Sequence, residues 1–309
     1  MQLLGEVNMS SKQALITKIQ NYSTKDGPGI RSTVFFIGCN LRCLWCANPE
    51  AMLPGIKLFH QKNLCIQCGR CKSDAITFEN HEMKFNRSIK HDPSQLIDTC
   101  FQNAFKQEGF YIEPKALAKK LLRDKHFYDS SNGGVTFSGG EAFLQNEVLL
   151  ETMQYLKKEN IHIAIETAGL WNYEQNQEII DLCDLFLFDI KAINTNIHKK
   201  CTGVGNEIIL KNIQRLCSNN KKIILRLVIV PGYNDQREDL LKRVQFIKKI
   251  NQSIIQVDIL KYHNYGEGKY IALGMEYPLQ NIDASTLDET VLWLQKEFEK
   301  NNIPCTIGG

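Results

Sequence analysis

The amino-acid sequence predicts an α/β protein whose main part is a partial, TIM-like (β/α)6 barrel with a small insert after the first strand. Six short runs rich in β-branched and aromatic residues alternate with amphipathic helical patterns, and this alternation is typical of parallel sheets. The runs are almost continuously apolar, which favours strands covered on both faces, as in a barrel. An open, doubly wound sheet would produce the same alternation and stays the alternative.

The expected elements follow in chain order. We predict strands over the segments 32–37, 134–140, 161–169, 184–191, 222–232 and 254–263. We predict helices over 113–122, 149–160, 176–183, 209–220, 238–250 and 286–300. Residues 52–111 lie between the first strand and the first helix and form the expected insert, which leaves residues 1–51 and 112–309 for the barrel.

Composition and charge narrow the class of protein. The 309 residues carry a net charge of only +3 and their lysines are scattered, so neither a nucleic acid nor a membrane is an expected partner. No run approaches the roughly 18 apolar residues of a spanning helix, and "MQLLGEVNMSSKQ" lacks the pattern of a secretory leader. We therefore expect a cytoplasmic monomer. Its eleven cysteines then favour metal binding over disulfides, because the cytosol keeps thiols reduced.

Three of these cysteines follow the first strand closely. The stretch "IGCNLRCLWCANPE" spaces Cys39, Cys43 and Cys46 as C-x3-C-x2-C. A closed zinc site takes four protein ligands and would need a distant fourth. A four-iron cluster fits the triplet better, because three thiolates leave one iron open to chelate an amine and a carboxylate, such as the methionine end of S-adenosylmethionine.

Other unusual residues also follow strands. In parallel α/β folds the carboxyl ends of the strands meet at one edge, where the active site lies. The residues that the sequence places at this edge are Cys39, Gly139, Gly140, Glu141, Glu166, Asp189, Lys191, Pro231 and His263.

The cysteine spacing resembles the signature of the radical S-adenosylmethionine (radical SAM) superfamily. The segments "DGPGIR", "FSGGEAF", "DIKAINTNIHKKCTG", "VIVPGYND" and "LKYHNYGEGKY" are similar to those of the activating enzymes of glycyl radical enzymes, the family of the pyruvate formate-lyase activating enzyme. The resemblance runs from about Ile16 to Tyr277. It implies that an electron from a flavodoxin or ferredoxin reduces a [4Fe-4S] cluster, that S-adenosylmethionine yields a 5′-deoxyadenosyl radical, and that this radical removes a hydrogen from a glycine of a partner enzyme.

The resemblance also assigns roles around the cofactor. It implies that Cys39, Cys43 and Cys46 ligate the catalytic cluster and that Gly139 and Gly140 lie against the methionine amino group. Glu141 accepts from that amine or serves as the acid at a helix N-terminus. His263 lies near the ribose, although a lone histidine is as often structural.

Four further residues complete the expected site. Glu166, Thr167 and Asp189 match positions that help to bind a monovalent cation beside the cofactor carboxylate. Lys191 matches a residue that contacts the partner's glycine loop, with a surface lysine as the alternative. Arg226 lies within a strand, where an unpaired guanidinium is costly, so we expect it to reach a carboxylate of the cofactor or of Glu141.

The insert carries a second cysteine group, "CIQCGRC". The resemblance implies a ferredoxin-like domain, found in activating enzymes whose partners are of the larger eliminase, dehydratase or lyase type, where it usually holds two four-iron clusters. Here Cys65, Cys68, Cys71 and Cys100 remain, and these are the four ligands of one cluster, because the last cysteine of each run ligates the other run's cluster. We predict one auxiliary [4Fe-4S] cluster, with zinc as the rival occupant.

Two other functions stay open at this stage. A radical SAM enzyme that acts on a small molecule would share the cysteine triplet but would not need "DGPGIR" or "YHNYGEGKY". A non-enzymatic iron or zinc electron-transfer module would share the insert but not the "SGGE" and "FDIK" strand ends.

Overall fold

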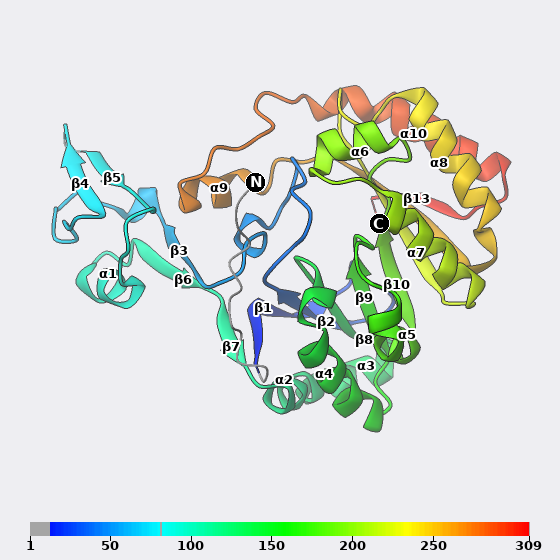
Figure 1. Ribbon diagram of the computed structural model, residues 1–309, viewed down its shortest axis with the longest axis horizontal. Coiled ribbons are helices and arrows are strands. Elements are labelled where there is room, and N and C mark those ends of the chain that lie inside the picture. Colours follow the sequence, from blue (N-terminus) through cyan, green and yellow to red (C-terminus); the bar gives the residue numbers. More distant parts are fainter. Residues whose placement is uncertain (1–12, 81, 309) are drawn as a thin grey trace.

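The computed structural model describes residues 13–80 and 82–308 and is built around one large curved sheet (Figure 1). The sheet has nine strands in the order β13-β12-β11-β10-β9-β8-β2-β1-β7. All six predicted strands are present, and β1, β7 and β13 were not predicted. The bounds are β1 Ala14–Ser23, β2 Arg31–Phe36, β7 Phe110–Ile112, β8 Gly134–Gly139, β9 Ile163–Thr167, β10 Leu185–Asp189, β11 Ile223–Ile229, β12 Ile254–Lys261 and β13 Cys305–Ile307.

The strand order decides between the two predicted architectures. From β2 through β8 to β13 each strand of this sheet pairs in parallel with the next one along the chain, whereas a doubly wound sheet reverses its order. The doubly wound alternative is therefore wrong. Within the described residues β7 and β13 end the sheet without pairing to each other, so the barrel is partial.

Helices lie along the outside of the curved sheet, as Figure 1 shows. They are α2 Pro114–Leu121, α3 Lys125–Ser131, α4 Asn146–Lys158, α5 Gln177–Leu182, α7 Glu207–Ser218, α8 Arg237–Lys249 and α10 Asp288–Lys300. Two further helices, α6 Thr195–Thr202 and α9 Glu267–Leu273, pack instead against the segment that follows β2. The outward side chains of the strands, such as Phe137, Phe186 and Phe188, are buried in the main core. Among the described residues, none of the helices combines the length and apolar character needed to cross a bilayer.

The inner face of the barrel changes character along the strands. Ala164, Leu185 and Leu187 form a small buried cluster inside the barrel. Successive side chains of a strand alternate between faces, so the next inward positions lie two residues further on. There the apolar residues give way to charged ones, namely Glu166 on β9, Asp189 on β10 and Arg226 on β11. Apolar inward side chains thus fill one end of the barrel, and charged inward side chains make the other end polar.

The "DGPG" loop between β1 and β2 forms the floor of this polar end. Asp26 accepts hydrogen bonds from the hydroxyls of Ser23 (2.6 Å) and Thr33 (2.7 Å). The Thr136 hydroxyl donates to the Asp26 carbonyl (2.6 Å), and fully buried Arg31 donates to the same Thr136 hydroxyl (2.7 Å). The motif therefore folds back against β2 and β8.

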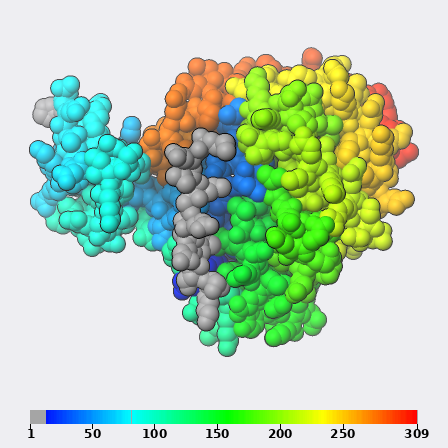
Figure 2. All heavy atoms as spheres, in the orientation of Figure 1, coloured from blue at the N-terminus to red at the C-terminus, as the bar shows by residue number. Residues whose placement is uncertain are grey.

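The insert projects from the barrel, at the left of Figures 1 and 2. Strands β3 (Lys57–His60) and β6 (Phe105–Glu108) pair antiparallel at its root, and β4 (Ile76–Glu79) and β5 (Glu82–Phe85) form a hairpin beside α1 (Pro93–Thr99). It has its own small core, which includes Leu58, Ala75, Ile76, Leu96 and Phe105.

The insert joins the barrel at two places. Strand β7 already pairs with β1, so the barrel resumes at Phe110 and the predicted end of the insert at residue 111 lies too late. The cause is a short strand whose partner, β1, was not predicted. Arg87 of the insert also donates to the Leu58 carbonyl (2.6 Å) and to the Ala272 carbonyl of α9 (2.8 Å).

Candidate active site

A cavity of about 420 Å³ opens at the polar end of the barrel. It lies at the carboxyl ends of the strands, as the sequence predicted. All the predicted site residues of the barrel line it except Glu141 and Arg226. Those that line it are Cys39, Cys43, Cys46, Gly139, Gly140, Glu166, Thr167, Asp189, Lys191 and His263.

The cysteine loop, residues 38–48, is held by the end of a helix. The N–H groups of Arg42 and Leu44 donate to the carbonyls of Thr202 (2.8 Å) and Cys201 (3.0 Å) in the last turn of α6. Carbonyls at a helix C-terminus have no partner within the helix, so they are free to accept such bonds. The "KKCTG" motif thus supports the cysteine loop. Sequence reasoning missed this role, and the Cys201 side chain itself is completely buried.

A second support comes from α9. Lys269 donates to the Asn48 amide oxygen (2.8 Å) and forms an ion pair with buried Glu50 (2.7 Å). A side chain at Gly266 would meet the Cys46 carbonyl at 2.9 Å. The "YGEGKY" segment therefore packs directly on the cysteine loop. The sequence offered the motif as a signal but not its contact.

The three thiols suit a metal cluster. Burial raises the pKa of Cys39 and Cys46 to about 11 and that of Cys43 to about 12. Thiols in such surroundings ionise when a bound metal supplies the compensating charge. Within residues 13–80 and 82–308, no three His, Cys, Asp or Glu side chains converge on a single-ion site. A four-iron cluster binds each thiolate to a different iron, so three thiols spread along one cavity wall fit it.

The close packing of neighbouring backbone segments requires glycine at positions 139 and 140. Gly139 has a φ of +106°, and a Cβ there would lie 2.4 Å from the Phe36 nitrogen and carbonyl oxygen. A Cβ on Gly140 would lie 2.1 Å from the Gly38 carbonyl oxygen. The two glycines therefore let the end of β8 pack against the start of the cysteine loop, and both also face the cavity.

Glu141 is the helix acid and does not line the cavity. It caps the 3-10 helix η4 (Ala142–Gln145), is completely buried, and accepts from Thr167 Oγ1 (2.8 Å), Ala168 N (3.2 Å) and Phe143 N (3.4 Å). Its expected contact with the cofactor amine is therefore not supported. Burial raises the pKa of Glu141 to about 7, against the effect of these hydrogen bonds.

The raised pKa of Glu141 predicts a pH effect on stability. A carboxyl group with a raised folded-state pKa favours folding most below its unfolded value of 4.5, and this contribution is lost as the pH rises through about 7. We expect the free energy of unfolding to fall by about 2–3 kcal/mol more in the wild type than in Glu141→Gln between about pH 5 and pH 8. Urea unfolding under anaerobic conditions measures this difference. Exposed Glu147→Gln is the control, and the same fall in Glu141→Gln as in the wild type would contradict the assignment.

Arg226 pairs with Glu166 and not with Glu141. Its Nη1 donates to Glu166 Oε1 (2.5 Å), and its Nη2 donates to the Lys25 carbonyl. Arg226 lies behind the cavity wall, so our expectation that it reaches Glu141 was wrong. Although burial alone would raise the pKa of Glu166, Arg226 and the Ser138 hydroxyl hold it below its usual value. Asp26, which sequence reasoning missed, lines the cavity 4.0 Å from Arg226.

The residues expected to bind a monovalent cation are already engaged. The Thr167 hydroxyl donates to Glu141 and accepts from Gly169 N and from Trp171 Nε1, both at 2.9 Å, which uses its whole hydrogen-bonding capacity. Both oxygens of Glu166 have partners, and Asp189 forms an ion pair with Lys191. The monovalent cation stays a prediction, and we derive no role for it.

Lys191 is a buried residue of the cavity wall. Its ammonium group lies 2.8 Å from Asp189, and its side chain is only 10% exposed, which excludes the surface-lysine alternative. Burial alone would lower the pKa of Lys191, but Asp189 and its other acidic neighbours hold it above its usual value. The Asn234 amide of "PGYND" donates to the Lys191 carbonyl (2.8 Å), so this turn fixes the backbone of the "DIK" segment.

His263 lies at the open side of the cavity. Its ring stacks on exposed Tyr265 with 4.2 Å between centroids. Both residues belong to the chain that leads from β12 into α9. The two aromatic rings are thus available to a ligand at the cavity mouth.

The second cysteine set also comes together. Cys65, Cys68, Cys71 and Cys100 line a cavity of about 240 Å³ in the insert, together with Phe78, Phe101 and Phe105. The structure brings Cys100, at the end of α1, to the three cysteines of the "CIQCGRC" loop. These four thiols line one mostly apolar space without converging on a single-ion site among the described residues, which suits an iron-sulfur cluster better than zinc.

Comparisons with known proteins concern the family of the chain. The model of the radical SAM superfamily matches residues 33–244. A 4-hydroxyphenylacetate decarboxylase activating enzyme from Clostridioides difficile is 36% identical over 97% of this chain and 98% of its own length. A choline trimethylamine-lyase activating enzyme from Oleidesulfovibrio alaskensis is 35% identical over 89% and 92%. A trans-4-hydroxy-L-proline dehydratase activating enzyme from Clostridioides difficile is 33% identical over 96% and 99%.

Solved structures share the fold. A radical SAM methyltransferase from Sphaerobacter thermophilus matches with a TM-score of 0.52 over 94% of this chain and 76% of its own. Streptococcus suis SuiB bound to its precursor peptide SuiA matches with a TM-score of 0.57 over 88% and 47%. Each is 12% identical to this chain, so these likenesses concern the fold alone.

Proposed function

The chain belongs to the radical SAM superfamily and, within it, to the activating enzymes of glycyl radical enzymes, and on this basis we propose a residue-level assignment of its site. Cys39, Cys43 and Cys46 hold the [4Fe-4S] cluster, and S-adenosylmethionine binds in the cavity beside them. The observation that carries the assignment is that three buried thiols share one cavity with the ends of β8, β9 and β10. A radical SAM enzyme of small molecules, the alternative, has no support among these relatives.

When bound, the cluster and S-adenosylmethionine supply a 5′-deoxyadenosyl radical that takes a hydrogen atom from a glycine of the partner. The chain's own residues bind and orient the cofactor and the partner's glycine loop. Gly139 and Gly140 present backbone to the cofactor amine, and Asp189 with Lys191 places charge at the cavity wall. Lys191 also contacts the partner's glycine loop, and His263 contacts the ribose. Glu141, Thr167 and Arg226 act through the wall by fixing β9.

The cognate partner is a glycyl radical enzyme of the decarboxylase, lyase or dehydratase type, by similarity to the named relatives. A flavodoxin or ferredoxin supplies the electron, and the chain acts as a monomer. The genes beside this one are where we expect the partner's sequence.

Radical transfer to the partner can be observed directly. We expect a glycine-centred doublet in the electron paramagnetic resonance spectrum when the reduced, reconstituted chain is mixed with S-adenosylmethionine and the cognate enzyme. A partner whose radical glycine is replaced by alanine should give no doublet while the cofactor is still cleaved. Turnover of a small substrate without a signal on any glycyl enzyme of the host would overturn the proposed function.

The insert holds one auxiliary [4Fe-4S] cluster on Cys65, Cys68, Cys71 and Cys100 in our proposal. Its support is the shared cavity that these four cysteines line. The cluster thereby joins the two cysteine segments of the insert, residues 65–71 and 100, across its small core.

Metal analysis of the anaerobically purified chain tests the auxiliary site. We expect about eight irons per chain, falling toward about four in Cys100→Ala, because two four-iron clusters become one. Buried Cys217→Ala in α7 should leave the count unchanged. About four irons with one zinc would assign the insert to zinc instead. About twelve irons would mean that other ligands build a second auxiliary cluster.

A further inference from the structure

The insert exposes an unusual surface around its cysteines. Ile66 is 64% exposed and Phe101 is 72% exposed, and both line the cavity of the second cysteine set. Cys68, between them, is itself exposed. Large apolar side chains that are exposed together on one surface often mark an interaction site. We call this surface the exposed cysteine face and define it by Ile66, Cys68, Arg70 and Phe101, which line the cavity together; Lys62 and Lys72 are its neighbours along the chain.

The charges on this face have one sign. Residues 61–73 contain Lys62, Arg70 and Lys72 and no acidic residue. All three cations are exposed, and none forms an ion pair with another described residue.

The cationic and apolar parts form one surface. The Arg70 guanidinium lies 4.3 Å from the centroid of the Phe101 ring, which joins the "CIQCGRC" loop to the segment after Cys100. Such stacking keeps the guanidinium charge over the ring while its outer face stays in water. A partner that approaches Phe101 therefore meets a fixed positive charge.

The insert projects from the barrel (Figure 2), and its cavity is separate from that of the barrel. The space-filling view shows the insert projecting from the barrel, joined only at one side (Figure 2). The cavity of the barrel is lined by residues of other elements and shares none with the cavity of the insert. A protein bound to the insert therefore does not have to occupy the cavity mouth.

We propose that the exposed cysteine face is the docking site for a small acidic electron-carrier protein of the flavodoxin or ferredoxin type. The proposal rests on the proposed function, which places a cluster behind this face. A few exposed apolar groups with a cation stacked on one of them suit the small interfaces of weak redox encounters. Charge complementarity mainly speeds association and selects the partner. A glycyl radical enzyme must instead reach the cavity of the barrel.

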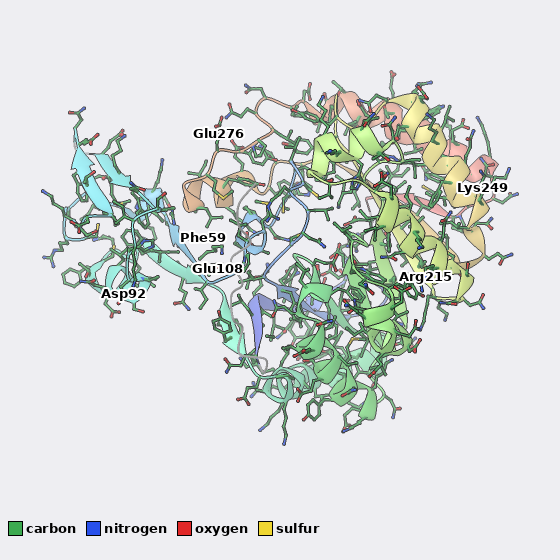
Figure 3. All side chains as sticks on the ribbon, in the orientation of Figure 1. Phe59, Asp92, Glu108, Arg215, Lys249 and Glu276 are labelled. Carbon is green, nitrogen blue, oxygen red and sulfur yellow. The ribbon has the colours of Figure 1, made fainter. Side chains whose placement is uncertain are left out.

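Binding measurements with matched charge reversals test this proposal. The probe is an oxidised flavodoxin of net negative charge, bound to the holo chain without S-adenosylmethionine. At about 20 mM salt we expect Arg70→Glu with Lys72→Glu to weaken binding about tenfold, and Lys62→Glu to weaken it by a smaller factor. The control pair is Lys248→Glu with Lys249→Glu on α8, at the opposite end of the molecule from the insert, where Figure 3 labels Lys249 and Asp92. It should change the affinity less than about twofold.

Each outcome of these measurements supports or overturns the proposed docking site. An unchanged iron content in the insert variants confirms that the cluster and its loop are intact. Equal weakening in both pairs, no weakening in either, or no binding of flavodoxin or of an acidic ferredoxin by the wild type would overturn the docking site. Loss of binding to the cognate glycyl enzyme with flavodoxin binding intact would assign the face to that enzyme and also overturn it.

The proposed function can fail separately. Reduction with dithionite bypasses any carrier protein, so a chain that forms the glycyl radical under dithionite but fails the binding test loses only the docking site. A chain that binds flavodoxin at this face but forms no glycyl radical with dithionite loses the proposed function.

Discussion

Cys43→Ala is expected to abolish cleavage of S-adenosylmethionine, with Cys39→Ala and Cys46→Ala behaving alike. Changes in residues that merely support metal ligands already cost up to about a hundredfold, so loss of a ligand should cost more. The assay is the yield of methionine and 5′-deoxyadenosine under reducing conditions. The iron of the insert should remain, because its cysteines line a separate cavity.

The control for this prediction removes a thiol elsewhere. Cys201→Ala alters a buried cysteine whose contact with the cysteine loop uses only its backbone carbonyl. We expect it to retain cleavage. A wild-type cleavage rate in any of the three ligand variants would show that the triplet does not hold the catalytic cluster.

Arg226→Leu is expected to lower the free energy of unfolding by about 3 kcal/mol, because it leaves Glu166, whose side chain is only 23% exposed, without its cation. Arg226 also holds the Lys25 carbonyl, so the floor of the cavity loses a contact. Adding Glu166→Gln should recover part of the loss, since the unpaired charge is gone. Urea unfolding of both single variants and the double variant gives this coupling.

The pH dependence of the free energy of unfolding gives a second test of this pair. The pKa of Glu166 is held low in the wild type, so the stabilisation it provides is present above the ordinary carboxyl range and is lost as the pH falls through the folded-state value. The deficit of Arg226→Leu should therefore shrink toward acid pH. The surface pair Arg215 and Glu174 (2.6 Å) is the matched control, and Arg215→Leu should cost less than about 1 kcal/mol. Equal costs for both arginines would contradict the buried-pair assignment.

The sequence predicted the elements that carry a periodic or a spaced signal. The apolar strands and the triplet at Cys39, Cys43 and Cys46 are both local patterns, and both are present at the predicted residues. Strand β7 spans only three residues and pairs with a strand far away along the chain. Such a segment has no period to read, which is why the end of the insert was misplaced.

Contacts at the site were less predictable for a different reason. The bonds from Arg42 and Leu44 to α6 involve backbone groups alone, and any residue could supply them. Whether Glu141 points into the cavity or behind it depends on the turn at Gly139, where φ is +106°. The family motifs marked these segments correctly, but only the folded chain shows that several of them serve to hold the cysteine loop.

Helix α9 couples the two cysteine-bearing parts of the molecule. Lys269 donates to side chains of the segment after Cys46. Three residues later, the Ala272 carbonyl accepts a hydrogen bond from Arg87 of the insert. One inserted residue between them would rotate one contact by about 100° relative to the other, because a helix turns once every 3.6 residues. Helix α9 must therefore keep its length between residues 269 and 272 for both contacts to form, and through them it fixes how the insert is oriented relative to the cysteine loop.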